Sequence, residues 1–424
     1  MCNIAQRNGR KKEKDISAAV GALNIGSELF FFAGKLFPVR ILLSKDLMKK
    51  WRWNKMKNKD GEYMRRAIIL ARKGSANVHP NPMVGAVIVK NDKIIGEGYH
   101  ERYGGLHAER NALQACQESP EGATLYVTLE PCCHYGKTPP CTEAIIQHKI
   151  ARVVIGTLDP NPKISGKSVE ILKEHHIQVT TGVLEESCKR LIRIFRKYIT
   201  TQRPFVLLKY AMTMDGKIAT RSGQSRWITG ELARWQVQKT RQELSAIMVG
   251  VQTVLTDDPL LTCRLEEGRT PLRIICDTHL RTPLSSKIVK TAGNIPTMLA
   301  TGCEDEAKKA VYRKKGCEIL MVKKKEDRLD LENLMVLLGQ RQIDSVLLEG
   351  GGTLSWSALQ QRVVDEVEAY VAPKIFGGPG ESPVEGEGVD FPDEAITLRP
   401  LSFSQVGKDY RIESEVLYPC LPES

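Results

Sequence analysis

The sequence predicts an α/β protein built from layered sheets and helices. Short apolar, β-branched runs such as 84–89, 124–129 and 153–156 are typical of buried strands, and residues 63–71 carry apolar side chains at helical spacing. Strands that alternate with helices favour sheets covered by helices, with ligands at strand ends and helix starts. A length of 424 residues allows two to three domains, each with its own core.

The first half of this pattern can be followed element by element. The turn-rich segment 79–82 leads into the strand 84–89, Asn91-Asp92 marks a hairpin turn, and 93–99 is the return strand. A helix is expected to start near His107. The strand 124–129 comes next, with Pro131-Cys132 at its end and a helix from about Thr142.

The net charge of +12 is concentrated near the N-terminus. Residues 1–60 hold 14 Lys and Arg against 5 Asp and Glu, whereas residues 61–424 hold 48 against 45. A nucleic-acid enzyme needs basic surface on its catalytic domain, where backbone phosphates dock. The nearly neutral remainder therefore argues against a nucleic-acid partner.

Residues 1–60 are expected to lie outside the working domains. Charged residues and a proline interrupt the apolar runs 29–32 and 41–43. No run approaches the ~20 residues needed to cross a bilayer, and no small-residue cleavage signal follows an apolar core. A disordered extension, or a translation start at Met48 or Met56, is the favoured interpretation. A basic organellar presequence is the alternative.

The segments His107-Ala108-Glu109, Pro131-Cys132 and Cys141 form the most informative motif. One imidazole and two thiols can hold zinc at three of four tetrahedral positions and leave the fourth for water. Glu109, two residues from His107, is then placed to move protons to and from that water, as in zinc deaminases. The motif predicts hydrolytic removal of an amine, with His107, Cys132 and Cys141 as ligands.

The other histidines and cysteines are interpreted as structural. Cys133 could compete for the metal, but adjacent side chains rarely point at one centre, and Cys132 follows Pro131 as the deaminase signature requires. Structural roles are assigned to His175, His176, Cys188, Cys276 and Cys317. Eleven cysteines without disulfide-scaffold spacing, together with thiol ligands, suit a reducing compartment, so we expect a cytoplasmic protein.

A second series of strands follows a domain boundary at 202–204, and the stretch 184–201 before it indicates one basic helix. The strand-like runs are 204–209, 246–250, 273–276 and 345–348. Three glycines, 350–352, follow the last strand and precede a helix, which suits a dinucleotide phosphate. A glycine-rich turn alone is more often only a turn, and the Rossmann G-x-G-x-x-G fingerprint does not occur there.

The run 128–141, Thr-Leu-Glu-Pro-Cys-Cys-His-Tyr-Gly-Lys-Thr-Pro-Pro-Cys, resembles the deaminase motif of the bifunctional riboflavin-biosynthesis deaminase/reductase family. Nucleic-acid and cytidine deaminases more often carry Pro-Cys-x-x-Cys, whereas eight residues separate the two thiols here. The segment 159–162 is a further match, although Ser168 replaces a residue that is often glycine. The order of motifs in the second half resembles the reductase of the same family, and the resemblance covers roughly Glu62 to the C-terminus.

The resemblance implies two domains and two reactions. We expect a cytidine-deaminase-like three-layer domain at 61–203 and a dihydrofolate-reductase-like domain at 204–420, after the extension 1–60. Zinc-dependent deamination of diaminohydroxyphosphoribosylaminopyrimidine would precede NADPH-dependent reduction of the ribosyl group, giving 5-amino-6-(5-phosphoribitylamino)uracil. The expected partners are the small-molecule substrate and further copies of the chain in a homo-oligomer, with neither nucleic acid nor membrane.

The resemblance also implies binding roles. Asn81 matches the residue that contacts the pyrimidine, His100 falls at a substrate-binding position, and Lys137 and Thr138 suit a substrate phosphate. The positions that hold NADPH match Ala211, Trp227, Thr253, Asp257, Thr278, Gly351, Gly352, Thr353, Leu354, Ser355, Trp356 and Ser357. The positions that hold the reductase substrate match Ser225, Arg241, Leu261, Arg264 and Glu349.

Several charged side chains have less settled roles in the reductase half. Arg241 and Arg264 can each bind a phosphate through two nitrogens. Lys209 and Asp257 are candidates for polar assistance at the reacting carbon. Lys209 could instead be a buried strand lysine that pairs with Asp215 or Glu349.

Two other classes of protein are alternatives to this interpretation. A nucleic-acid deaminase with an accessory domain would bind RNA or DNA in a salt-sensitive manner after removal of residues 1–60. A scaffold protein with a silent zinc site would lack the catalytic glutamate. The near-neutral charge of 61–424 argues against the first class, and Glu109 argues against the second.

Overall fold

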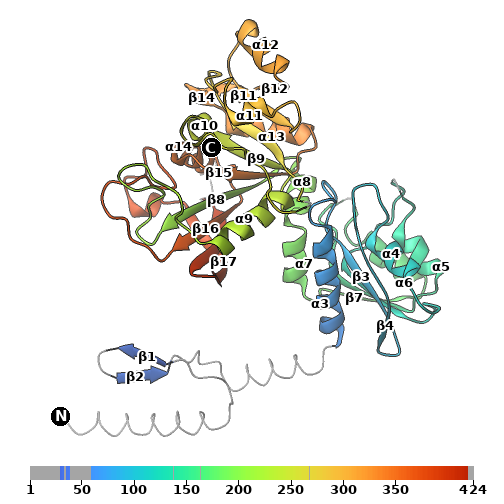
Figure 1. Cartoon of the computed structure of the whole chain (residues 1–424). Coiled ribbons are helices and arrows are strands. Elements are labelled where there is room, and N and C mark those ends of the chain that lie inside the picture. The colour runs from blue at the N-terminus through green and yellow to red at the C-terminus, as the bar shows by residue number, and fades with distance from the viewer. Residues whose placement is uncertain are drawn as a thin grey trace, which may run out of the picture. The chain divides into compact units, whose positions relative to one another are not determined.

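The computed structural model describes residues 59–136, 138–162, 164–266 and 268–418, and the backbone of a strand pair nearer the N-terminus. That pair is β1 (Leu29–Phe32) and β2 (Lys35–Pro38), which run antiparallel. The other expectations for residues 1–60, including a disordered extension, a later start and a presequence, lie outside the described residues. From Lys59 onward, two sheets organise the chain (Figure 1).

The first sheet has five strands. Their spatial order is β4 (Lys93–Tyr99), β3 (Gly85–Lys90), β5 (Thr124–Leu129), β6 (Arg152–Thr157) and β7 (Gln178–Thr181). The pairs that involve β3 are antiparallel, and β5, β6 and β7 are parallel to one another. The predicted hairpin turn at Asn91-Asp92 is confirmed: both residues have positive φ and join β3 to β4.

Helices cover both faces of this sheet. One face carries α3 (Lys59–Ala71), followed by a short 3-10 turn (Arg72–Gly74), and α7 (Glu185–Leu191). The other face carries α4 (Ala108–Gln114), α5 (Cys141–Gln147) and α6 (Lys167–Glu174). Figure 1 shows α3 and α7 side by side. The three-layer arrangement expected for this half is therefore present.

Successive residues of β3 belong to different hydrophobic cores. Ala86 and Ile88 pack into the core beneath α4 and α5, whereas Val87 and Val89 pack into the core beneath α3 and α7. This division follows from the strand geometry, in which adjacent side chains point to opposite faces. The continuous apolar run seen in the sequence is thus a strand buried on both sides.

Two glycines let α4 approach β4 closely. A Cβ atom at Gly98 would lie 2.5 Å from the carbonyl oxygen of Ala108 and closer still to the backbone nitrogen of Ala112. A Cβ at Gly96 would meet the sulfur of Cys116 and the backbone of Ala112. Since α4 begins directly after His107, this contact sets the position of the first turn that carries the predicted catalytic residue.

The expectation of one basic helix over 184–201 is wrong. The segment forms α7 and a second helix, α8 (Arg193–Thr201), which meet at Ile192. The backbone of Ile192 leaves helical geometry, with φ −100° and ψ 17°, and its side chain is buried in the core under α3 and α7. The chain therefore turns between two cores, because Ile194 already packs against the second sheet.

The second sheet has nine strands, of which the first seven are parallel. Strands β18 and β17 then add antiparallel. Their spatial order is β12 (Glu318–Met321), β11 (Thr297–Thr301), β10 (Leu272–Cys276), β9 (Ala246–Gly250), β15 (Ser345–Glu349), β8 (Phe205–Thr213), β16 (Glu366–Ala372), β18 (Asp409–Leu417) and β17 (Thr397–Val406). A two-stranded ribbon, β13 (Lys324–Lys325) with β14 (Arg328–Leu329), lies outside this sheet.

Helices also pack on both faces of the second sheet. One core contains residues of α13 (Leu331–Gln340) and α14 (Gly352–Gln360). The core on the other face contains residues of α8, α10 (Val251–Asp257), α11 (Lys287–Lys290) and α12 (Glu306–Lys314), and α9 (Glu231–Glu243) packs beside β16. A short 3-10 turn, Pro392–Glu394, precedes β17. The predicted α/β class is confirmed for both halves.

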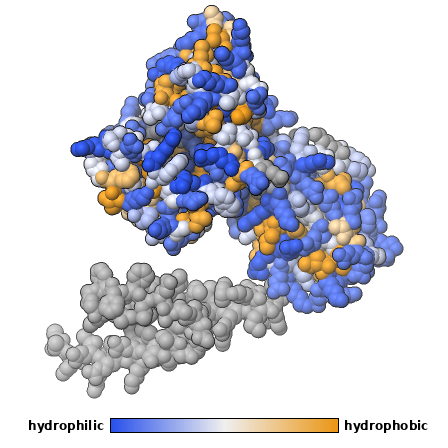
Figure 2. Space-filling view, in the orientation of Figure 1, coloured by the Kyte–Doolittle hydropathy of each residue, from blue (hydrophilic) through white to orange (hydrophobic). Residues whose placement is uncertain are grey.

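The visible surface is mainly hydrophilic, with separate hydrophobic patches between the polar residues (Figure 2). On the edge strand β17, Leu398, Leu401 and Phe403 are exposed. Within the described part of the chain, no helix combines the length and apolar character needed to cross a bilayer.

We predict that Gly98→Ala destabilises the first domain. Its new methyl group would push against the backbone of α4, and overpacking of this kind costs about 1–3 kcal/mol. Urea unfolding followed by circular dichroism should show the lower stability. Gly293→Ala is the control, since a Cβ there has no neighbour within 4 Å. Equal stability of the two variants would contradict the proposed contact.

Candidate functional site

Three side chains on separate elements meet at one edge of the first sheet. Cys132 follows β5, His107 precedes the first turn of α4, and Cys141 is the first residue of α5. The Nδ1 atom of His107 lies 3.4 Å from each of the two sulfur atoms. The ligand atoms of all three residues lie within 4.8 Å of one another.

This geometry fits a tetrahedral zinc ion. Zinc–sulfur and zinc–nitrogen bonds of usual length place tetrahedral N and S ligands about 3.6 Å apart, close to the two distances from His107. The Cys141 thiol donates to Cys132, which lowers the pKa of Cys132 and raises that of Cys141. The backbone nitrogen of Cys141 lies 3.3 Å from the Cys132 sulfur and further favours a thiolate there.

Glu109 lies in the first turn of α4 and is only 3 % exposed. Burial raises the pKa of its carboxyl group, and the nearby imidazole of His107 opposes that rise. The group of side chains that could hold a metal ion consists of His107, Cys132 and Cys141 and does not include Glu109. Its carboxyl group is therefore available for a role other than metal binding. A buried carboxyl group with a raised pKa beside a metal site is suited to take up and release protons.

The predicted substrate residues of this domain lie next to the metal cluster. The amide nitrogen of Asn81 lies 3.1 Å from Nε2 of His100, and Nδ1 of His100 lies 2.9 Å from the carbonyl oxygen of Leu106. The rings of His100 and His107 meet edge to face, with centroids 5.6 Å apart. Thr138 Oγ1 is 3.5 Å from Nε2 of His107. Lys137 lies outside the described residues.

Cys133 does not belong to the cluster formed by its neighbour. Burial raises the pKa of the Cys133 thiol, and the negative charge of Glu130 raises it further. Glu130 itself is buried and accepts hydrogen bonds from the backbone of Asp159, Gly166 and Ser168. The predicted preference for Cys132 over Cys133 thus agrees with the geometry. Cys188 and Cys317 belong to hydrophobic cores.

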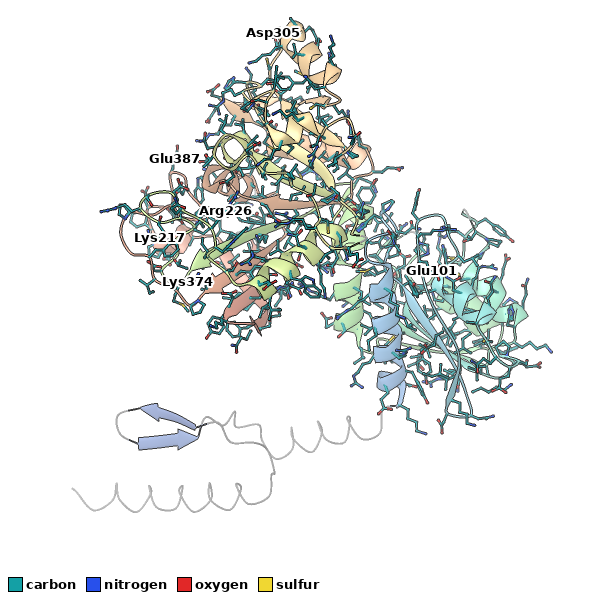
Figure 3. The ribbon with its side chains drawn as sticks, in the orientation of Figure 1. Glu101, Lys217, Arg226, Asp305, Lys374 and Glu387 are labelled. Carbon is teal, nitrogen blue, oxygen red and sulfur yellow. The ribbon has the colours of Figure 1, made fainter. Side chains whose placement is uncertain are left out.

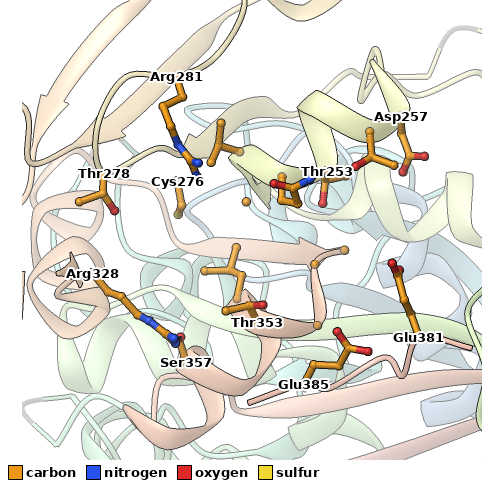
Figure 4. A pocket seen from close by; sticks show the side chains of 18 of the residues that line it. Thr253, Asp257, Cys276, Thr278, Arg281, Arg328, Thr353, Ser357, Glu381 and Glu385 are labelled. Carbon is orange, nitrogen blue, oxygen red and sulfur yellow. Dashed lines mark hydrogen bonds between the residues drawn. The ribbon is translucent and has the colours of Figure 1, made fainter. Parts of the chain in front are cut away.

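The second sheet carries a cavity of about 730 Å³ at the carboxyl ends of its parallel strands (Figure 4). After β9 the chain continues through α10 on one face, and after the neighbouring β15 it continues through α14 on the other. Connections that leave adjacent strands toward opposite faces open a crevice, where ligands of open α/β sheets bind. Gly250 and Gly350 line this crevice.

Glycines let the backbone come close to the opposite wall of the cavity. Gly350 and Gly351 have φ of +91° and +84°, a region that favours glycine. A Cβ on either residue would lie within 3.5 Å of Oγ1 of Thr253, at the start of α10. The glycine turn and the start of α14 thus border the cavity, and the N-terminus of a helix favours a phosphate group.

The cavity brings together many of the predicted NADPH residues. Nine predicted residues line it: Thr253, Asp257, Thr278, Gly351, Gly352, Thr353, Leu354, Ser357 and the predicted substrate residue Ser225. Ser355 and Trp356 lie elsewhere: the Ser355 hydroxyl donates to Gly351 O, and Trp356 packs against Gly386. Ala211 packs near α9.

Trp227 lies on the surface rather than in this cavity and is 55 % exposed. The guanidinium group of Arg234 stacks over its ring at 4.6 Å. Lys374, labelled in Figure 3, donates to its carbonyl oxygen at 2.8 Å. One face of the ring of this predicted NADPH-binding residue is therefore covered by an arginine.

Three of the predicted reductase residues form a buried cluster of charges around one carboxylate. Arg241 donates from Nε and Nη2 to the two carboxylate oxygens of Glu349, at 2.9 and 2.8 Å. Lys209 Nζ lies 3.8 Å from the same carboxylate, so of the two partners considered for it, Glu349 is the one found. Asp215 instead binds Thr213 and the backbone of Gly377.

This pairing changes the interpretation of the two arginines. The fork of Arg241 is directed at Glu349, and its Nη1 donates to the carbonyl oxygen of Thr262. Arg264 is exposed, and its backbone nitrogen donates to the side-chain oxygen of Gln238 at 2.9 Å. Leu261, in the same loop, is buried with φ +54°. Arg264 is thus better placed than Arg241 for two-nitrogen binding of a phosphate.

Several residues of the cavity were missed by the sequence analysis. Arg281 lines it from a loop and Arg328 from β14, and Arg328 donates to the Ser357 hydroxyl at 3.1 Å (Figure 4). Glu381 and Glu385 line it as well. Cys276, which was assigned a structural role, also lies in its wall. Neither isolated arginines nor isolated glutamates form a motif, so no local signal marked them.

Two family models match successive parts of the chain. Residues 57–157 match the cytidine and deoxycytidylate deaminase zinc-binding region, and residues 204–412 match the RibD C-terminal domain. The riboflavin biosynthesis protein RibD of Actinobacillus pleuropneumoniae is 50% identical over 361 residues, which are 85% of this chain and 96% of that protein. The chain belongs to the RibD family.

Solved structures of RibD proteins agree with this assignment. The Thermotoga maritima deaminase/reductase is 40% identical, covers 84% of this chain and 99% of its own, and gives a TM-score of 0.74. RibD of Acinetobacter baumannii is 36% identical, with coverages of 85% and 99% and a TM-score of 0.74. As a RibD protein, the chain joins a zinc-dependent deaminase and an NADPH-dependent reductase of riboflavin biosynthesis. The individual residue roles stay predictions.

We predict that Cys132→Ser loses bound zinc and that Cys133→Ser retains it. Only the first substitution removes a sulfur atom of the cluster, and the loss of affinity should exceed the roughly 10–100-fold effect of outer-shell changes. Atomic emission after dialysis measures zinc per chain. Equal zinc content in the two variants would rule out the ligand assignment.

We predict that Glu349→Gln lowers the free energy of unfolding by about 3–5 kcal/mol at neutral pH, because Arg241 loses its buried partner. Burial alone would raise the pKa of Glu349, but Arg241 and Lys209 lower it from 4.5 to about 2. The stabilisation is therefore complete above pH 4.5 and is lost as the pH falls toward 2.

Urea titrations at a series of pH values test this prediction. The difference between the native chain and Glu349→Gln should shrink as the pH falls through that window. Glu387→Gln, which changes an exposed carboxylate (Figure 3), serves as the control and should follow the native chain. A difference that stays constant with pH would refute the ion-pair explanation.

Proposed function

We propose that the first domain deaminates diaminohydroxyphosphoribosylaminopyrimidine by hydrolysis, and that the second reduces the ribosyl group of the product to a ribityl group. The burial of Glu109 beside the cluster of His107, Cys132 and Cys141 carries the first assignment. When bound at the cluster, zinc supplies a Lewis acid that makes water nucleophilic near neutral pH.

Glu109 manages the protons of this hydrolysis. It accepts a proton from the attacking water and delivers protons to the ring nitrogen and the departing amine. A carbon–oxygen bond forms, the carbon–nitrogen bond breaks, and ammonia leaves. Asn81 and His100, held together at 3.1 Å, orient the pyrimidine ring, while Thr138 and Lys137 bind the substrate phosphate.

The cavity of the second domain is the proposed place of the reduction. When bound, NADPH supplies a hydride to the anomeric carbon of the ring-opened ribosyl group. The glycine turn 350–352 and Thr253 receive the phosphates of the dinucleotide. Ser225 and Arg264 bind the substrate, while Glu349 holds Lys209 close to the reacting carbon.

We further propose a cytoplasmic enzyme that acts on a small molecule as a homo-oligomer. Free cysteines in the described residues, including the two of the metal cluster, suit a reducing compartment. The exposed apolar side chains of β17 would be covered in such an oligomer. The prediction of no nucleic-acid partner rests on the near-neutral charge of residues 61–424. The prediction of no membrane partner rests on apolar runs that fall short of the ~20 residues needed to cross a bilayer.

We predict that the two reactions can be abolished separately. Glu109→Gln keeps the metal ligands and should lower the deamination rate by about 10²–10⁴-fold. Gly351→Val places a β-branched residue at φ +84° beside Thr253 and should abolish NADPH binding. Each variant is assayed for ammonia release and, with the deaminated intermediate, for NADPH oxidation.

Each variant controls for the folding of the other half. Glu109→Gln should reduce the deaminated intermediate at the native rate, and Gly351→Val should release ammonia at the native rate. Native ammonia release by Glu109→Gln would refute its role as acid and base. NADPH oxidation by Gly351→Val would refute the placement of the dinucleotide.

A further inference from the structure

A histidine of the deaminase domain is held by the reductase domain. Nδ1 of His79 lies 2.6 Å from Oδ2 of Asp344, and its Nε2 lies 2.7 Å from the carbonyl oxygen of Glu243. Asp344 is the residue before β15, and Glu243 is the last residue of α9. Both ring nitrogens thus lie within hydrogen-bonding distance of oxygen atoms of the other domain.

The acceptor for His79 is itself firmly positioned. The Asp344 side chain is 1 % exposed, and its other oxygen accepts from the hydroxyls of Ser245 and Ser345 at 2.6 and 2.8 Å. Despite the burial of Asp344, hydrogen bonds from His79 and these serines keep its pKa below the usual range. A buried carboxylate with several donors is a rigid, strong acceptor.

The same loop continues into the deaminase site. Asn81 follows His79 by two residues, and its backbone nitrogen donates to the carbonyl oxygen of Val78 at 2.8 Å, which closes a tight turn. The Asn81 side chain contacts His100, whose ring lies against the zinc-ligand candidate His107. One side of this turn is thus tied to the reductase and the other to the metal site.

A small pocket between the two domains lies beside this turn. Residues of both domains, among them Val78, His79, Asn81 and Glu243, line a cavity of about 20 Å³. That volume holds about one water molecule.

We propose that His79 is a positioning residue of the deaminase, and that the reductase domain supplies its anchor through Asp344 and the carbonyl oxygen of Glu243. The anchor holds Asn81 in the orientation that binds the pyrimidine ring. This inference rests on the proposed binding role of Asn81. It places one determinant of deaminase substrate affinity in the reductase sequence.

Other contacts join the same two parts of the chain without touching the loop of Asn81. Lys197 on α8 lies 2.7 Å from Asp365, and the Tyr198 hydroxyl donates to the carbonyl oxygen of Gly339 at 3.2 Å. These contacts dock the domains independently of His79. Lys197→Ala is therefore a matched control that weakens the interface and leaves the loop in place.

The test measures deamination kinetics in the full-length, zinc-loaded chain. His79→Ala and Asp344→Asn should each raise KM for the pyrimidine substrate by about 10-fold, with a smaller change in kcat, because the ring is bound in a less favourable orientation. Zinc content and the reduction of the deaminated intermediate should stay at native values. Lys197→Ala should lower thermal stability and leave KM unchanged.

The outcomes separate this inference from the proposed function. A native KM in His79→Ala overturns the positioning role, as does an equal rise of KM in Lys197→Ala. If His79→Ala does not fold, Asp344→Asn decides in the same way. Asn81→Ala is measured alongside: a native KM there refutes the binding role of Asn81, whereas the kinetics of the other variants still decide whether His79 affects substrate affinity.

Discussion

The thiolate forms of Cys132 and Cys141 and the carboxylate form of Glu109 would place negative charges close together in a largely buried site beside His107. Burial raises the pKa of Glu109, whereas the hydrogen bond with Cys132, followed by burial, raises that of Cys141, and negative charges on the two groups repel one another. A divalent ion stabilises such a site, because it favours the thiolates and offsets the desolvation of the carboxylate. The fold of the first domain brings this set together after the end of β5 and at the starts of α4 and α5.

The reductase half achieves its site by a different physical means. Its cavity results from the topology of the sheet, since the chain leaves β9 and β15 toward opposite faces. Charge is compensated inside the protein, where Glu349 pairs with Arg241 and Lys209. The first site therefore needs an ion to complete it, whereas the second offers a preformed space with backbone donors at its rim.

The sequence predicted the features that depend on local patterns. Residue type and spacing were sufficient to predict the strands 84–89 and 124–129, the hairpin turn at Asn91-Asp92 and the metal cluster. It missed features that depend on tertiary contact. The break at Ile192 follows from burial in two cores, Arg281 reaches the cavity from a separate loop, and the partners of His79 lie 164 and 265 residues away.

The alternation along β3 limits how this gene can change. Ala86 and Ile88 pack into one core, and Val87 and Val89 pack into the other. Deletion or insertion of a single residue would exchange the two sets and place each side chain against the wrong helices. Length variation in this region of related genes should therefore be confined to the turn at Asn91-Asp92, while β3 itself tolerates only replacements that preserve volume.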